Sequence, residues 1–495
     1  MEEMNNRVLK HYIAGEWARA NNTTYHSILN PATQEVIAHA PAATRDETIH
    51  AIQQAKQSYE EGIWADVTPQ ERSTILTQIA NKLETHQNEL IHLEVLNNGK
   101  TIREAESDVI ESIHTFRYYA SLLQVTQDHV HNQPNHIQTL TIKEPIGVVG
   151  LIVPWNFPLL MSVWKIAPAL AAGNSILLKP AEITPLTVHR LFELIDETDL
   201  PKGVATLIMG EGTIVGDELS KNKDVHMISF TGSTAVGKQI MQAAANNMKK
   251  ISLELGGKSP SIVLEDANLD LAVDYSLFGI FMGAGQVCSS GSRILVHESI
   301  YDKFVEKYIA RAKEIRTGPG LEESSEMGAI VSEKHLQTIL KYIEIGIEEG
   351  ATLALGGRRL TTEACKSGFF IEPTVFIDVD NDMRIVQEEI FGPVVTIQKF
   401  QDDTEAIKLA NDVDYGLAGA VFSEDLKRAL SVIKKVRAGI TWINNYHLTD
   451  VQSPWGGYKD SGTGRSLGTY GLDEYQEVKQ INIKLDEALS DWFDA

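Results

Sequence analysis

The spacing of apolar and polar residues changes character near residue 147. Before that point, apolar residues recur with helical spacing in "TRDETIHAIQQAKQSYEEGIW" and again over 69–98 and 100–122. Thr44 and Glu47 have the spacing of a capping box at the start of the first stretch. The pattern predicts short strands and turns up to residue 40, followed by three long amphipathic helices.

From Gly147 onward, short apolar runs alternate with helical segments. The runs "VVGLIVP", "SILLKP", "VATLIMG" and "VHMISFTG" each precede a predicted helix, near 159–172, 185–197, 213–220 and 234–246. A second series contains "PSIVLEDA", "SRILVH", "ATLALGG", "VVTIQKF", "AGAVFS" and "GITWIN". Apolar strands that alternate with helices are typical of parallel sheets covered on both faces. We therefore predict two doubly wound α/β domains that meet near Gly256–Gly257.

Composition narrows the range of partners. The chain has 495 residues, 43% of them hydrophobic and 22% charged, as expected for a globular protein of two or three domains. Its net charge of -23 argues against nucleic acid or an anionic membrane surface as a partner. Prolines 154 and 158 interrupt the longest apolar run, so no membrane span is predicted. Two cysteines, Cys288 and Cys365, and the absence of a signal-peptide pattern favour a cytoplasmic protein.

Loops at predicted strand ends suggest a nucleotide site. "GEGTIVG", which contains Gly212, departs from the dinucleotide fingerprint, and an ordinary turn explains it equally well. "FTGSTAVG" places Gly232 and Ser233 at a helix start, where backbone N–H groups can bind phosphate. Lys179 and Glu182 follow another strand and can hold ribose hydroxyls, and the carboxylate favours NAD over NADP. The alternatives are an ordinary helix cap and an exposed ion pair.

Three further residues suggest covalent catalysis. Cys288, in "GQVCSSGSR", is a candidate nucleophile. Glu254 precedes a Gly-Gly pair in "LELGGKSP" and can act as a general base for the thiol or for water. Asn156, in "PWNFP", can donate its amide to an oxyanion. Each residue also has a structural explanation, as a buried cysteine, a capping Glu or a turn Asn. Together they supply a nucleophile, a base and an oxyanion hole.

The motifs in combination resemble the aldehyde dehydrogenase superfamily. The resemblance extends over nearly the whole chain, through "YIAGEW", "NPATQEVI", "PWNFPLLMSVWKIAPALAAGNSILLKPAEITPLT", "FTGSTAVGK", "LELGGKSP", "GQVCSSGSRI", "EEIFGPVV", "WGGYKDSGTGR" and "EVKQI". "SPWGGYKDSG" and "GQVCSSGSR" are most similar to the bacterial branch that oxidises betaine aldehyde.

The resemblance implies a mechanism. Cys288 would form a thiohemiacetal with the aldehyde and, after hydride transfer to NAD, a thioester. Asn156 and the Cys288 backbone N–H would hold the oxyanion. Glu254 would activate the hydrolytic water, which argues against relatives that acylate coenzyme A. The implied cofactor contacts are Trp155, Lys179, Glu182, Gly212, Gly232, Ser233, Glu389 and Phe391. NADP remains possible, and no metal ion is expected.

One position departs from the family pattern. Ser466 stands where many members carry an acidic residue that is thought to relay protons from the general base. A hydroxyl takes up a proton less readily than a carboxylate, so we expect deacylation to depend more on Glu254 alone.

The resemblance also implies three parts of the molecule. Residues 1–124 and 145–256 would form the NAD-binding domain, and residues 257–460 the catalytic domain. Residues 125–144 and 461–495 would form an oligomerisation extension and a C-terminal tail. A hairpin near 125–144 and a strand near 476–484 belong to this extension. Its free edge would pair across subunits in a homodimer or homotetramer.

The substrate pocket implied by the resemblance contains aromatic and apolar side chains, namely Phe157, Met161, Trp164, Met282, His447 and Trp455. Aromatic faces attract quaternary ammonium groups by about 2 kcal/mol in a desolvated site. Phe157, Trp164 and Trp455 therefore predict betaine aldehyde as the substrate. The position of Met282 often holds an aromatic residue among betaine aldehyde enzymes. A methionine there favours the alternative, a hydrophobic tunnel for aliphatic, aromatic or amino aldehydes.

Two hypotheses from other functional classes stay open at this point. One is an inactive binding protein that keeps the fold, and the other is a thiol acyltransferase or hydrolase without a redox step. The intact set of Cys288, Glu254 and Asn156 argues against the first, and the paired nucleotide-site loops argue against the second.

Overall fold

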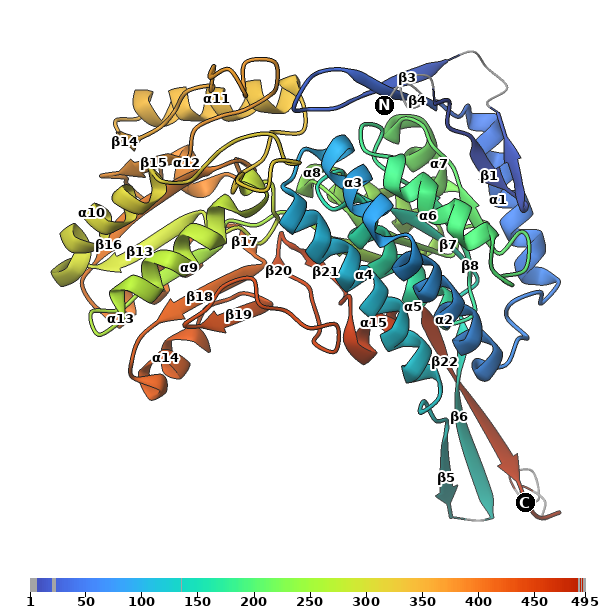
Figure 1. Cartoon of the computed structure of the whole chain (residues 1–495). Coiled ribbons are helices and arrows are strands. Elements are labelled where there is room, and N and C mark those ends of the chain that lie inside the picture. The colour runs from blue at the N-terminus through green and yellow to red at the C-terminus, as the bar shows by residue number, and fades with distance from the viewer. Residues whose placement is uncertain (1–6, 20–23, 135, 488–489, 491, 493–495) are drawn as a thin grey trace.

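Two large sheets, each packed against helices, organise the chain (Figure 1). The computed structural model describes residues 7–19, 24–134, 136–487, 490 and 492. The first sheet has eight strands in the order β2-β1-β9-β8-β7-β10-β11-β21, and the second has seven in the order β14-β15-β16-β13-β12-β18-β19. The prediction of two α/β domains is confirmed. β11 of the first sheet ends at Glu254 and β12 of the second begins at Pro260, on either side of Gly256–Gly257.

The first sheet is parallel at its centre. β7 (Val148–Ile152), β8 (Ser175–Lys179) and β10 (Met227–Thr231) are buried along their whole length, which explains their unbroken apolar sequences. The remaining strands are β1 (His11–Ile13), β2 (Glu16–Ala18), β9 (Ala205–Leu207), β11 (Lys250–Glu254) and β21 (Gly462–Thr463). The later helices of this half are α5 (Pro158–Ala171), α6 (Leu186–Asp196), α7 (Asp217–Lys221), α8 (Thr234–Ala244) and α15 (Gly468–Glu474).

Two predicted helices differ from the structure. The predicted capping box is present at α1 (Arg45–Glu60), where Thr44 and Glu47 bond reciprocally. The single helix predicted over 69–98 is wrong, because His86 leaves the helical conformation (φ -107°, ψ 17°) and separates α2 (Pro69–Thr85) from α3 (Gln87–Asn98). The helix predicted near 213–220 begins instead as a π-helical turn, Gly212–Gly216. α4 (Ile102–Leu123) follows the prediction.

The second sheet includes one strand that the sequence pattern missed. β15 (Thr374–Ile377) lies between antiparallel β14 and parallel β16. The other strands are β12 (Pro260–Val263), β13 (Arg293–His297), β14 (Thr352–Leu355), β16 (Val394–Phe400), β18 (Ala418–Phe422) and β19 (Ile440–Ile443). The helices of this half are α9 (Leu269–Phe281), α10 (Tyr301–Ala312), α11 (Glu333–Glu348), α12 (Arg384–Gln387), α13 (Asp403–Asn411) and α14 (Leu426–Ile433).

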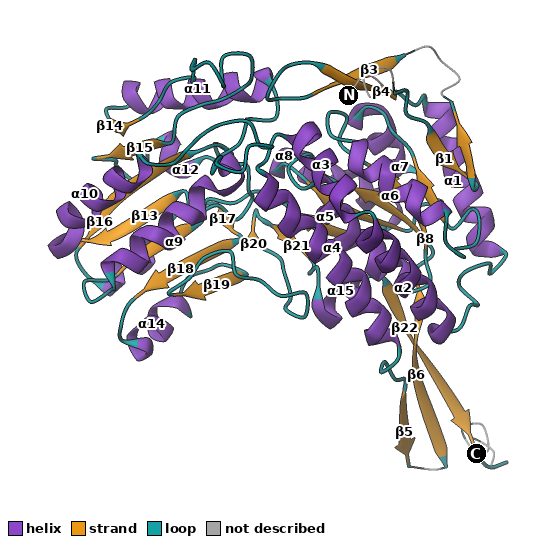
Figure 2. Ribbon diagram, in the orientation of Figure 1, coloured by secondary structure: helices purple, strands orange, loops and turns teal. Residues whose placement is uncertain are grey.

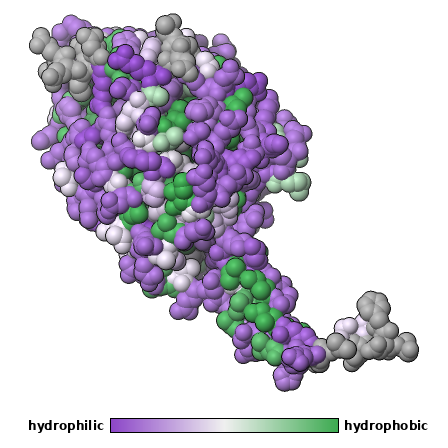
Figure 3. All heavy atoms as spheres, turned by 90° about the vertical axis from the view of Figure 1, so that its right-hand side faces the viewer, coloured by the Kyte–Doolittle hydropathy of each residue, from purple (hydrophilic) through white to green (hydrophobic). Residues whose placement is uncertain are grey.

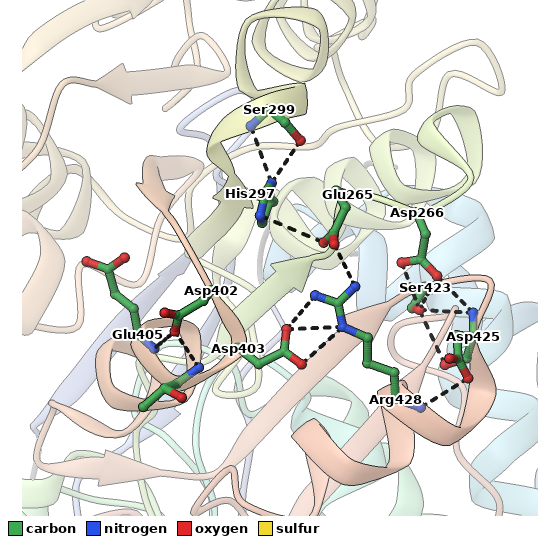
Figure 4. Close-up of polar contacts among 11 residues, drawn as sticks. Glu265, Asp266, His297, Ser299, Asp402, Asp403, Glu405, Ser423, Asp425 and Arg428 are labelled. Atoms are coloured by element: carbon green, nitrogen blue, oxygen red, sulfur yellow. Dashed lines mark hydrogen bonds and ion pairs between the residues drawn. The ribbon is translucent and has the colours of Figure 1, made fainter.

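A polar network joins the carboxyl ends of the central strands of the second sheet (Figure 4). Arg428 of α14 donates to both carboxylate oxygens of Asp403 and to Glu265 at 2.8 Å. The Asp266 carboxylate accepts from the Ser423 hydroxyl and, at 2.9 Å, from the Asp425 backbone N–H. These bonds connect the residues that follow β12, β16 and β18, so they stabilise this edge of the sheet.

A narrow antiparallel sheet projects from the body (Figures 1 and 2). β5 (His129–Gln133), β6 (Ile137–Pro145) and β22 (Gln476–Lys484) have the order β22-β6-β5, and β22 pairs with β6 over its full length. The predicted hairpin and C-terminal strand are therefore present as one sheet. The remaining strands form two short pairs, β3 (Tyr25–Leu29) with β4 (Val36–Pro41) and β17 (Tyr415–Gly416) with β20 (Tyr458–Lys459).

Over the described part of the chain, the helices are too short or too polar to cross a membrane.

Candidate active site

The candidate residues of the first half follow strands that end side by side. β9, β8, β7, β10 and β11 are neighbours in the sheet and run parallel. The strand ends and the loops after them carry, in that spatial order, Gly212, then Lys179 with Glu182, then Trp155 with Asn156, then Gly232 with Ser233, and finally Glu254. The carboxyl edge of such a sheet is the usual position of a ligand site. Segments far apart in sequence thus meet at one edge.

One cavity of about 530 Å³ joins most of these residues to Cys288. Its lining includes Asn156, Glu254 and Cys288. The predicted cofactor residues in the lining are Trp155, Gly232, Ser233, Glu389 and Phe391. The predicted substrate residues in it are Phe157, Met161, Trp164, Met282, His447 and Trp455. Lys179, Glu182 and Gly212 form a separate group that does not border this cavity. The nucleophile, base and amide predicted from sequence therefore line one cavity.

A tight turn brings Cys288 into the cavity. After α9 the backbone adopts left-handed conformations at Gly283, Ala284 and Gly285 (φ 61°, 54° and 71°). A Cβ atom at Gly285 would lie 2.1 Å from the Gly392 carbonyl oxygen, so the turn requires a glycine there. Cys288 is partly exposed. Burial, together with the Glu254 and Glu389 carboxylates, raises the pKa of the thiol to about 12. A base or a nearby positive charge is needed to generate the thiolate.

Asn156 is held rigidly beside this turn. Its side-chain amide donates to the Gln286 carbonyl oxygen at 2.8 Å, and only 8% of the residue is exposed. The Asn98 amide fixes the same loop by donating to the Trp155 carbonyl oxygen at 2.8 Å and to the Asn156 carbonyl oxygen at 3.3 Å. Because an amide nitrogen carries two hydrogens, Asn156 retains one donor for an oxyanion formed near Cys288.

Glu254 is a buried carboxylate at the end of β11. The residue is 5% exposed, and both carboxylate oxygens lack a hydrogen-bond partner among the described residues. Burial raises its pKa to about 8, while Lys165 and Arg465 act in the opposite direction. A carboxyl group in a cavity with a pKa near neutral pH is suited to accept a proton from water or from a thiol.

The Gly256–Gly257 pair passes between Glu389 and the nucleophile. The Gly257 N–H donates to Glu389 Oε1 at 3.0 Å. A Cβ atom at Gly256 would lie 2.0 Å from Glu389 Oε2, and one at Gly257 would lie 2.5 Å from the Cys288 carbonyl oxygen. Both positions exclude a side chain, because the carboxylate and the cysteine loop lie against the backbone.

A second cluster lies one strand further along the same edge. The Lys179 ammonium donates to Glu182 Oε1 at 3.0 Å, and this oxygen also accepts the Gly212 N–H at 2.7 Å. The charge of Lys179 and these hydrogen bonds lower the pKa of Glu182 against the opposing effect of burial. The sequence did not indicate that Gly212 would bind the same carboxylate. A fixed carboxylate next to an ammonium group fits the hydroxyls of a ribose.

Aromatic side chains build the cofactor end of the cavity. Trp155 packs edge-to-face on Phe391 and on His335, with ring centroids 5.2 Å and 5.1 Å apart. Sequence reasoning missed His335, whose Nε2 bonds to the Phe391 carbonyl oxygen at 2.7 Å. Ser233 is the N-cap of α8, as the alternative explanation proposed, and its position also directs the first N–H groups of that helix toward the same edge.

The substrate end contains two tryptophans in contact. Trp164 and Trp455 pack edge-to-face with centroids 5.5 Å apart. The Lys100 ammonium lies 4.5 Å from the centre of the Phe157 ring, so one face of this ring is already occupied by a cation. His447 bonds to the Gly279 carbonyl oxygen at 3.1 Å, and burial lowers its pKa to about 4, so its ring is neutral.

Sequence reasoning missed an acidic face of α4. Glu104, Asp108 and Glu111 border the cavity, as does Phe278 of α9. The acids are spaced i, i+4 and i+7 on a helix, which is the signal that could have identified them. Asp108 pairs with Lys100, and the Glu104 carboxylate accepts the Gly283 N–H at 2.7 Å. Burial raises the pKa of Glu111 to about 7, and the nearby Trp164 indole opposes that change. A carboxylate thus lies beside the aromatic pair.

Comparison with known proteins gives a consistent result. The sequence model of the aldehyde dehydrogenase family matches residues 17–481. Betaine aldehyde dehydrogenase of Bacillus subtilis (strain 168) is 48% identical over 98% of this chain and 99% of its own, and betaine aldehyde dehydrogenase 1 of Oryza sativa subsp. japonica is 43% identical over 97% and 96%. A crystal structure of betaine aldehyde dehydrogenase from Staphylococcus aureus in complex with NAD+ superposes with a TM-score of 0.96 at 46% identity, over 98% of this chain and 96% of that one.

The match covers the whole second sheet, the central strands of the first sheet and every segment that lines the cavity. With a thiol, a buried carboxylate and a fixed amide gathered at the carboxyl edge of the sheet, the chain belongs to the aldehyde dehydrogenase family.

Proposed function

We propose that this protein oxidises betaine aldehyde to glycine betaine with NAD as the electron acceptor. The observation that carries the proposal is the single cavity. It connects the edge of the first sheet to Cys288 and continues to a pair of tryptophans beside a carboxylate. The relatives named above include a betaine aldehyde dehydrogenase crystallised with NAD+.

The cofactor proposal rests on the strand-end residues. Lys179 and Glu182 would bind the adenosine ribose, and the Glu182 carboxylate would repel a 2′-phosphate, which favours NAD over NADP. Gly232 and Ser233 at the start of α8 would bind the pyrophosphate. Trp155, Glu389 and Phe391 would contact the nicotinamide riboside. When bound, the nicotinamide ring supplies a positive charge near the thiol and accepts the hydride.

The chemical steps follow from the geometry around Cys288. The thiolate attacks the aldehyde carbon, and the resulting oxyanion receives hydrogen bonds from the Asn156 amide and the Cys288 N–H. Loss of hydride from this thiohemiacetal leaves a thioester on Cys288. Glu254 then removes a proton from water, which attacks the thioester carbon, and the thiolate leaves as the carboxylic acid forms.

The substrate proposal combines aromatic contact with charge. A trimethylammonium group cannot donate a hydrogen bond, so it is recognised by aromatic faces and nearby anions. Trp164 and Trp455 offer the aromatic surface. Glu111 offers a partly buried carboxylate beside it. Phe157 contributes at most one ring face, because Lys100 covers the other.

A panel of aldehydes tests the proposal. Betaine aldehyde, 4-aminobutyraldehyde and hexanal are each assayed with NAD and with NADP, beside a Cys288→Ala variant. We expect the highest kcat/KM for betaine aldehyde with NAD, and no turnover by the variant, which still binds NAD. A preference for hexanal would favour the hydrophobic tunnel instead. Failure to oxidise any aldehyde would favour an inactive binding protein.

We also propose that subunits pair through the projecting sheet. β22 and β5 are its free edges, and apolar side chains remain exposed on them, namely Val130, Val478, Ile481 and Ile483. Leu485, directly after β22, is exposed as well. Figure 3 shows apolar surface gathered on this extension. Apolar edge strands are normally covered by another chain, so a homodimer or homotetramer is expected. The division into NAD-binding domain, catalytic domain and extension, and the cytoplasmic location, stay predictions.

A further inference from the structure

A buried lysine interacts electrostatically with the proposed general base and donates to a serine hydroxyl that also accepts from a tyrosine. Lys165 of α5 is 2% exposed, and its ammonium donates to the Ser229 hydroxyl oxygen at 3.1 Å. The Tyr475 hydroxyl donates to the same oxygen at 3.0 Å. Ser229 and Tyr475 are 1% and 4% exposed, so water does not compete for these bonds. Three elements, α5, β10 and the end of α15, thus meet at one oxygen atom.

Strand register places this group beside Glu254. Ser229 of β10 pairs with Ser252 of β11, and Thr231 pairs with Glu254. Residues two apart on a strand share a face, so the side chains of Ser229 and Glu254 lie on the same side of the sheet. They are one strand and two residues apart. The Glu254 carboxylate has no hydrogen-bond partner of its own in the described chain. The charge of Lys165 lowers the pKa of this carboxylate.

Charged and titratable groups from several elements interact with the Glu254 carboxylate. Lys165 and Arg465 favour its ionised form, while Glu474 opposes it. Cys288 and Tyr475 also interact electrostatically with Glu254. Burial lowers the pKa of Lys165 to about 8, and the Glu254 charge opposes that change. Within the described residues, no hydrogen bond links Ser466, which replaces the acid of many family members, to Lys165.

We propose that Ser229 and Tyr475 are positioning residues that hold the Lys165 ammonium near Glu254, and that Lys165 held in this way keeps the carboxylate ionised for the hydrolytic step. The inference rests on the proposed function, because Glu254 is the base only if a thioester is hydrolysed. Neither hydroxyl needs to contact the substrate, so their effect reaches the reaction through Lys165.

Loss of either hydroxyl changes the positive charge that faces Glu254. Removing the Ser229 hydroxyl, which accepts from the ammonium, disfavours the charged form of Lys165 and lowers its pKa. Tyr475→Phe leaves this acceptor in place but removes the bond that fixes its position, so we expect a smaller effect in the same direction. Less positive charge then faces Glu254, so the pKa of Glu254 rises. The hydrolytic step should consequently require a higher pH in Ser229→Ala and in Tyr475→Phe. A shift of about one pH unit corresponds to a loss of about tenfold in rate on the acid side of the profile.

Two measurements on the full-length enzyme test the proposal. The first is the pH profile of kcat, with any aldehyde of the panel that the wild type oxidises. The second needs no turnover: Cys288 is alkylated with iodoacetamide over a range of pH and quantified by peptide mass spectrometry. Glu254→Gln identifies the inflection that this carboxylate causes. Ser175→Ala is the matched control, since Ser175 is a fully buried serine on β8 without a partner for its hydroxyl.

We expect both variants to move the Glu254 inflection and the acid limb of kcat upward, and the control to leave them in place. The two variants lie on different elements. If one of them fails to fold, the pH profile of the other still tests the proposal. The proposal would be overturned by an unchanged inflection, by a downward shift, or by a uniform loss of rate at all pH values. It would also be overturned if Glu254→Gln did not alter the wild-type profile. If the enzyme oxidises no aldehyde, the proposed function fails, while the alkylation profile still reports on Lys165.

Discussion

At the residue scale, the glycine pair next to Glu254 constrains the site most tightly. Gly256 and Gly257 separate the Glu389 carboxylate from the cysteine loop, and neither has room for a methyl group. A strand-to-strand connection with ordinary side chains would push both groups out of the cavity.

We expect Gly257→Ala to lower kcat/KM by at least about tenfold, because the new Cβ atom would displace the Cys288 carbonyl and with it the nucleophile. Gly216→Ala is the control, since the nearest heavy atom to a Cβ there is 3.9 Å away. Steady-state kinetics compare kcat/KM of both variants with that of the wild type. Equal activity of Gly257→Ala and wild type would show that the cysteine loop tolerates the displacement.

The acidic face of α4 gives a second prediction for single residues. We expect Glu111→Gln to raise KM for betaine aldehyde about tenfold and to leave KM for hexanal unchanged, since only the cation benefits from the carboxylate. Glu106→Gln is the control, because Glu106 is exposed on the same helix. A similar change for both aldehydes would assign Glu111 a structural role.

The same carboxylate predicts a pH dependence. Burial raises the pKa of Glu111 to about 7, so it is neutral below that pH and charged above it. KM for betaine aldehyde should therefore fall as the pH rises through about 7. Glu111→Gln should abolish this trend, which initial-rate measurements across the range would detect. A trend that persists in the variant would have to come from another group.

At the element scale, polar bonds connect the residues that follow neighbouring strands at one edge of the second sheet. Asp266 connects the end of β12 to the turn between β18 and α14 by accepting from Ser423 and from the Asp425 N–H (Figure 4). Removing the carboxylate leaves both donors without that acceptor.

We expect Asp266→Ala to lower the free energy of unfolding by about 1–2 kcal/mol, the usual cost of unpaired donors in a partly exposed position. Asp270→Ala is the comparison, since its side chain is 84% exposed and its one ion pair, with Lys307, lies at the surface. Thermal denaturation of both variants measures the difference. Equal melting temperatures would mean that water replaces the lost acceptor.

At the scale of the whole molecule, sequence periodicity predicted the helices and strands better than it predicted which of them contact one another. The α/β alternation and the capping box at Thr44 were readable because they are local. The break at His86 was not, since the helical spacing continues through it. Glu111 of α4 and Cys288 in the loop after α9 line the same cavity. Their spacing in the sequence does not show this, because it depends on how the two segments pack in the folded chain.

The projecting sheet supports a prediction about assembly. We expect Ile481→Lys with Ile483→Lys to yield smaller species than the wild type in light scattering, because both side chains are exposed on edge strand β22. Gln480→Lys, on the opposite face of the strand, should leave the assembly intact. A monomeric wild type would contradict the proposed pairing.

The central claim concerns the sulfur of Cys288 and the carboxylate of Glu254. Glu254→Gln is mixed with betaine aldehyde and NAD, and NADH formation is followed alongside mass spectrometry of the Cys288 peptide. Our account predicts one burst of NADH per site and a trimethylammonioacetyl group retained on Cys288. Reduction of NAD without acylation of Cys288, or steady turnover by Cys288→Ala, would contradict it.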